Sequence, residues 1–217
     1  MSSQPRKESS YLSLASVIVL VGFATGCALG VTRVNVTHDS LATIENKREG
    51  DILVKQFVDK RKDRQYIGNK RNMYGMVMGH VGTKEGVEIQ DLLTKYFAEA
   101  LKEAGYNAII QESEPATIPK VVRFDAIVEG EIREFWLDLY MATWHKVAVL
   151  VKALDKDTQQ VLWEKEVRGE EKNVLWVGVA AEFEKVMREA LTKALNQAGK
   201  EFASEEFYKA LKLEMSH

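Results

Sequence analysis

The chain has 217 residues, with 30 lysines and arginines against 32 aspartates and glutamates, so its formal net charge is only −2. This balance gives no overall attraction to nucleic acid, and we expect no nucleic-acid partner. The single cysteine excludes an internal disulfide, and the length fits one domain with a sizeable core.

The N-terminal segment has the pattern of a secretory signal. Arg6 and Lys7 stand in a short polar head, and an apolar run follows from Leu12 to Phe23. The run falls short of the roughly 20 apolar residues that a helix needs to cross a bilayer. It ends at Phe23-Ala24-Thr25-Gly26-Cys27, which contains the only cysteine of the chain.

The small residues before Cys27 resemble the lipobox, the cleavage motif of bacterial lipoproteins, although Ala24 stands where leucine is more usual. The resemblance implies that residues 1–26 are a signal peptide and that Cys27 becomes a diacylglyceryl cysteine with a further acyl chain such as palmitate. Two or more acyl chains anchor a protein stably in a bilayer. Ala28 replaces the aspartate that favours inner-membrane retention, so the resemblance implies a lipid anchor in the outer membrane, on the periplasmic face. An ordinary cleaved signal and an uncleaved anchor are the alternatives.

Residues 27–50 are mostly polar or small and show no sustained period, which predicts an acylated N-terminus and a flexible tether. The rest, residues 51–217, is predicted to form a single periplasmic α+β domain. Its first strand is expected over residues 52–58. A long loop then follows, rich in basic residues, and Tyr66, Lys70, Arg71 and Tyr74 lie in it. These four are candidate contacts for lipid headgroups, glycan phosphates or an acidic partner, and the alternative is a solvated loop whose tyrosines cover the edge of the core.

The remaining pattern predicts two long helices and a meander of strands. Apolar residues recur at helical spacing over 89–104, with Gly105 as the stop signal, and again over 178–199. Strands are expected at 107–111, 124–136, 145–151 and 161–167, with a hairpin turn at 155–159 and a short final helix at 204–211. The fold class predicted is α+β, with a mixed, largely antiparallel sheet, helices packed on one face and the order β-α-β-β-β-β-α.

Tryptophans offer a better clue to binding than any catalytic pattern does. Trp163 shares the inward parity of Val161 and is predicted to be core, whereas Trp136 could belong to an exposed apolar rim and is a further candidate contact. Glu129 and Glu131 read as an exposed acidic stripe. The histidines lack metal-binding spacing, and no nucleophile or phosphate-binding motif is present, so we expect no metal, no cofactor and no enzymatic activity.

The layout resembles the YajG-like family of bacterial outer-membrane lipoproteins. The likeness rests on Cys27 and on residues 100–106, 125–133, 147–154 and 207–211. It implies an envelope location and a sheet-and-helix domain, and it implies no reaction. We therefore expect a non-enzymatic binding or assembly component of the cell envelope that contacts lipid through Cys27 and binds another envelope protein or its own copies. A glycan- or peptidoglycan-binding module is the alternative, and an envelope hydrolase is third.

Overall fold

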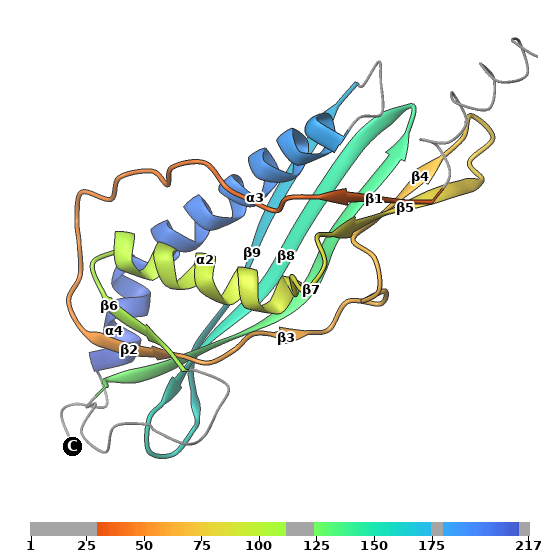
Figure 1. Ribbon diagram of the computed structural model, residues 1–217. Coiled ribbons are helices and arrows are strands. Elements are labelled where there is room, and N and C mark those ends of the chain that lie inside the picture. Colours follow the sequence, from red (N-terminus) through yellow and green to blue (C-terminus); the bar gives the residue numbers. More distant parts are fainter. Residues whose placement is uncertain (1–29, 112–123, 175–179, 213–217) are drawn as a thin grey trace, which may run out of the picture.

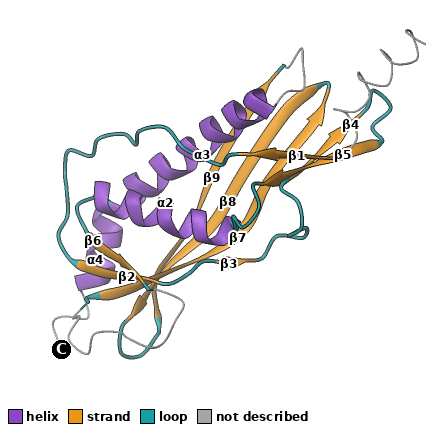
Figure 2. Cartoon of the chain, in the orientation of Figure 1, coloured by secondary structure: helices purple, strands orange, loops and turns teal. Residues whose placement is uncertain are grey.

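The computed structural model describes residues 30–111, 124–174 and 180–212. The predicted signal peptide, Cys27 and Trp176 lie outside these ranges. Within them, nine strands form one open sheet, and no helix is long and apolar enough to span a bilayer. The sheet is covered by helices on one face, as predicted (Figures 1 and 2).

A long antiparallel meander forms the larger part of the sheet. It consists of β7 (Ala126–Tyr140), β8 (Ala142–Asp155) and β9 (Val161–Asn173). The predicted alternation is present, because valines at every second position of β8 are buried while their neighbours face the other side. All three strands extend several residues beyond their predicted C-terminal ends, whereas β7 begins two residues later than predicted. The hairpin turn lies between β8 and β9 as expected.

The other edge of β7 receives three short parallel strands at different heights: β2 (Asp51–Val54), β3 (Val58–Asp59) and β4 (Gly68–Arg71). The sheet continues beyond β2 through β6 (Asn107–Ile110), and beyond β4 through β5 (Val77–Thr83) to β1 (Gly30–Val34). The longest ladders are antiparallel and the short ones are mostly parallel, so the sheet is mixed in the way that the fold class anticipated.

The helices are α2 (Ile89–Glu103), α3 (Ala180–Phe202) and α4 (Glu205–Lys212). Each long helix buries the apolar stripe that its sequence period predicted. Gly169 of β9 allows α3 to approach closely, because a Cβ at this position would collide with the backbone carbonyl of Ala190. The core lies between these helices and the inner face of β7, β8 and β9, and it includes Trp163, as predicted.

The prediction of a flexible tether is wrong for residues 30–50. Gly30–Val34 is a strand, and residues 35–50, here named the strap, lie across the two long helices. The Tyr96 hydroxyl donates to the carbonyl of Val36 at 2.8 Å, and the backbone amide of Asn35 donates to the Glu184 carboxylate at 2.7 Å. The strap therefore belongs to the folded domain.

Two further predictions need correction. The first strand, expected over residues 52–58, is divided into β2 and β3. The long basic loop, expected to lack regular structure, contributes β4 and leads into β5. These segments gain their strand geometry by pairing with β7 and with each other.

Candidate binding groove

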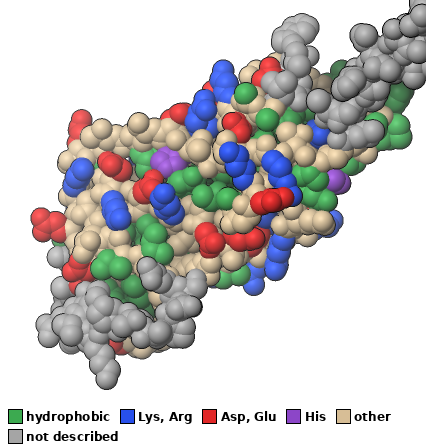
Figure 3. Space-filling model, viewed as in Figure 1, with side chains coloured by type: hydrophobic (Ala, Val, Ile, Leu, Met, Phe, Trp, Pro, Cys, Tyr) green, Lys and Arg blue, Asp and Glu red, His purple; other side chains and the backbone are tan. Residues whose placement is uncertain are grey.

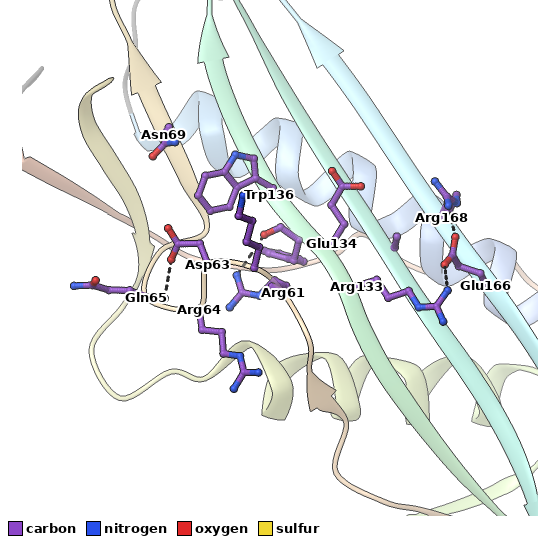
Figure 4. Close-up of a pocket in the computed structure, with 13 residues that line it drawn as sticks. Arg61, Asp63, Arg64, Gln65, Asn69, Arg133, Glu134, Trp136, Glu166 and Arg168 are labelled. Atoms are coloured by element: carbon purple, nitrogen blue, oxygen red, sulfur yellow. Dashed lines mark hydrogen bonds and ion pairs between the residues drawn. The ribbon is translucent and has the colours of Figure 1, made fainter. Parts of the chain in front are cut away.

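A groove of about 800 Å³ opens on the face of the sheet opposite α3. Figure 4 shows α3 behind the strands and the side chains of the groove in front of them. Outward-facing residues of the meander form its floor, and residues 61–65 form one wall. The side chains that shape it most are Arg61, Asp63, Arg64, Glu134, Trp136 and Glu166.

A bulge in β7 creates the space. The register of β7 against β8 shifts between Ile132 and Glu134, so Phe135 faces the core and Trp136 faces outward. The pairing of β3 with β7 ends at Ile132 of β7, and the pairing of β4 with β7 begins at Leu137 of β7. The chain between β3 and β4 leaves the edge of β7 over this interval and bows outward as the wall of the groove.

Arg61 secures this wall from inside. Its guanidinium binds both carboxylate oxygens of Asp59, with Nη2 2.7 Å from Oδ2, and Nη1 donates to the carbonyls of Tyr66 and Phe135. The side chains of Arg61 and Asp59 are only 5% and 12% exposed. Burial by itself would raise the pKa of Asp59, but the hydrogen bonds and charge of Arg61 outweigh it and lower that pKa. Arg61 is thus a structural residue of the groove.

Apart from Arg61, the groove is lined by four basic side chains (Lys62, Arg64, Arg133 and Arg168) and three acidic ones (Asp63, Glu134 and Glu166), so the excess is one positive charge. Glu166 is neutralised by Arg133, whose Nη1 is 2.7 Å from Oε2, and by Arg168. The hydrogen bond from Arg133 is the main reason that the pKa of Glu166 is lowered. Lys62 and Arg64 are exposed, and neither forms an ion pair within the part of the chain that the structure describes. The groove therefore favours a ligand that carries negative charge.

The structure does not bring the five candidate contact residues together. Trp136 lines the groove and is half-buried. Tyr66 stacks on His80, with ring centroids 4.0 Å apart. Lys70 is 5% exposed and donates to the Thr32 hydroxyl at 2.9 Å, so it faces the interior.

The other two candidates lie toward the end of the molecule where β4 meets β5. Arg71 pairs with Asp138, with Nε 2.9 Å from Oδ1. Tyr74 is 78% exposed in the turn between these strands. Of the five residues, only Trp136 lines the groove. The sequence analysis did not identify Asp63, Glu134 or Glu166: the bulge turns Glu134 toward the groove, whereas Asp63 comes from the loop after β3 and Glu166 from β9.

Glu129 and Glu131, expected to form an exposed acidic stripe on β7, are only partly exposed. Glu131 accepts a hydrogen bond from Lys152 at 2.8 Å, which is the main cause of its lowered pKa. Among the described residues, no group of three or more histidine, cysteine or acidic side chains could hold a metal ion.

No protein-family model matches the sequence. No curated protein matches it significantly either. Solved structures do match the fold. Protein XCC0632 from Xanthomonas campestris, of the family DUF330, has a TM-score of 0.51 at 15% identity, over 86% of this chain and 98% of its own. A Helicobacter pylori protein, named as a homologue of a neuraminyllactose-binding hemagglutinin, has a TM-score of 0.52 at 11% identity, over 86% and 100%.

A more distant match is lipoprotein GNA1162 from Neisseria meningitidis, with a TM-score of 0.39 at 13% identity over 69% of this chain and 98% of its own. The structural neighbours thus include bacterial lipoproteins. At these identities the likeness to the Xanthomonas and Helicobacter proteins is one of fold alone, and the chain is similar to both in the arrangement of its sheet and helices.

Proposed function

We propose that this chain is an acylated lipoprotein of the bacterial envelope that acts by binding, with the groove on the open face of its sheet as the binding site. The observation that carries the proposal is the groove itself, which combines a partly exposed tryptophan with several basic side chains and a net excess of one positive charge. Large aromatic side chains and arginines contribute most to binding at protein interfaces. The ligand is a negatively charged segment of another envelope protein or of a second copy of the chain.

The anchor is the second part of the proposal. The sequence around Cys27 supports acylation, and the resemblance to YajG-like lipoproteins supports the outer membrane, facing the periplasm. Intact-mass measurement and membrane fractionation of the wild type beside Cys27→Ala test this part. The wild type should lack residues 1–26, carry acyl mass and sediment with the outer membrane, whereas a retained N-terminus or a mass without lipid would contradict it.

A photo-crosslinking amino acid at Arg64 tests the groove in whole cells, and the same amino acid at Lys185 is the matched control. Lys185 is exposed on α3, on the opposite side of the sheet. A discrete adduct is expected from position 64 only, and Trp136→Ala should abolish it. The same adducts from both positions, or an adduct that survives Trp136→Ala, would show that the groove is not the binding site.

A glycan is the second candidate ligand, and one observation favours it. The Trp136 ring borders a groove that also contains a carboxylate and an amide, Glu134 and Gln65, and these groups can bind sugar hydroxyls. Purified peptidoglycan fragments that bind the wild type and not Trp136→Ala, in the absence of a protein adduct, would favour this ligand.

A further inference from the structure

One end of the molecule carries large apolar side chains that are exposed to solvent and do not belong to the core. The turn between β4 and β5 and the turn between β7 and β8 lie there, and Met73, Tyr74, Met76 and Met141 are 73%, 78%, 57% and 79% exposed. Figure 3 shows hydrophobic side chains gathered over this end, at the upper right. We name this surface the apolar tip; its members are Met73, Tyr74, Met76, Val77, Met78, Tyr140 and Met141.

The two turns form one surface. Strand β4 pairs with the end of β7, so that Lys70 is level with Leu139, and the Tyr140 hydroxyl donates to the carbonyl of Met73 at 3.3 Å. The side-chain oxygen of Asn72 accepts hydrogen bonds from the backbone amides of Tyr74 and Met76, each at 3.0 Å. These bonds fix the shape of the turn. The turn is therefore preformed with its apolar side chains directed into solvent, where polar residues are the usual choice.

The site of the lipid anchor is at the same end. Gly30 pairs with Gly79, which directly follows Met78 of the apolar tip. Cys27 precedes Gly30 by three residues. Because each residue of an extended chain spans at most about 3.6 Å, the Cα atom of Cys27 lies within about 11 Å of that of Gly30. A lipid attached at Cys27 therefore brings the bilayer to this end of the domain.

The rim of the apolar tip has the composition of a membrane interface. Trp144 is 44% exposed, with the Lys172 ammonium 4.9 Å from its ring centre and that of Lys146 at 6.0 Å. Tryptophan and tyrosine concentrate at the headgroup level of membranes. Lysines beside them are attracted to anionic lipid.

We propose that the apolar tip inserts into the headgroup region of the bilayer that holds acylated Cys27, so that lipid and protein contacts together fix the orientation of the domain. This inference rests on the proposed acylation of Cys27. The occupant is a lipid surface and not a second copy of the chain, because the anchor places lipid next to the tip before any partner is bound.

The test uses the full-length lipoprotein purified from membranes and reconstituted in vesicles of phosphatidylethanolamine and phosphatidylglycerol. Acylation blocks the thiol of Cys27, so Met141→Cys provides the one reactive thiol for an environment-sensitive fluorophore. Lys156→Cys is the matched control, because Lys156 is exposed in the turn at the other end of β8, up to about 45 Å away. The fluorophore at position 141 should shift to shorter wavelength and be quenched several-fold more strongly by spin-labelled lipid than the fluorophore at position 156.

Three outcomes would overturn the proposal. Equal, weak quenching at both positions, in protein that carries acyl mass and floats with the vesicles, would refute tip insertion while leaving the proposed anchoring intact. A wavelength shift at position 141 without quenching would identify a second copy as the occupant. Protein with a reactive Cys27 and no acyl mass would overturn both the anchoring and the tip proposal.

Discussion

Replacing Asp59 with alanine is expected to destabilise the domain by about 3–5 kcal/mol, the cost of breaking a buried ion pair by removing one partner. The Arg61 side chain is 5% exposed. Without Asp59, its charge would keep only the carbonyls of Tyr66 and Phe135 as acceptors. The Arg71–Asp138 pair provides the matched control, because its side chains are 32% and 38% exposed. Asp138→Ala should cost less than about 1 kcal/mol, as exposed pairs do.

Urea unfolding, monitored by tryptophan fluorescence, measures the loss of unfolding free energy in Asp59→Ala and in Asp138→Ala, provided that the slope of free energy against urea concentration is unchanged. The double variant, Asp59→Ala with Arg61→Met, should lose less unfolding free energy than the sum of the losses in the two single variants. The reason is that no unpaired charge remains buried in the double variant. Equal costs for Asp59→Ala and Asp138→Ala, with no coupling in the double variant, would refute the reasoning that this pair is desolvated.

Three further predictions concern packing, pH and the groove. Gly169→Ala should lower stability by about 1–3 kcal/mol, because its methyl group would collide with the backbone of α3. Gly199→Ala should be nearly neutral, because its one tight contact is with the end of the Ile44 side chain; thermal unfolding compares the two variants. Burial lowers the pKa of His145 from 6.5 to about 3, and neither nitrogen of its ring has a hydrogen-bond partner among the described residues. Between these pH values the unfolded chain therefore binds one more proton than the folded protein, and stability should fall by about 2 kcal/mol from pH 7 to pH 5. His145→Leu should remove this part of the loss. Equal losses in the wild type and in His145→Leu would contradict the prediction. Trp136→Ala should abolish ligand capture with little change in the unfolding midpoint, and a large loss of stability would instead make Trp136 a core residue.

The elements with a strong period could be predicted from the sequence. The meander and both long helices lie where alternation and helical spacing placed them, because in each case one face is buried against the core. Gly199 was expected to end its helix. It lies inside α3 instead, facing Ile44 of the strap, where a small residue permits close packing.

The short strands could not be predicted in this way. Strand β4 reads Gly-Asn-Lys-Arg, and β5 contains two glycines, so neither shows an alternating apolar face. Their geometry comes from partners far along the chain. The groove escaped prediction for a related reason, because continuous alternation from Ile132 would direct Trp136 into the core, and the bulge reverses this.

The strap imposes an order on folding. Its backbone amides at Asn35, Asp39 and Ala42 donate to side chains of α3 that are 149, 153 and 154 residues further along the chain. None of these bonds can form until α3 has been synthesised, and closing contacts over such separations is slow. Val36, buried in the finished domain, meanwhile has no core to cover it. The strap is thus made early but cannot reach its final position until α3 is complete, and we expect its amide hydrogens to be protected slowly during refolding.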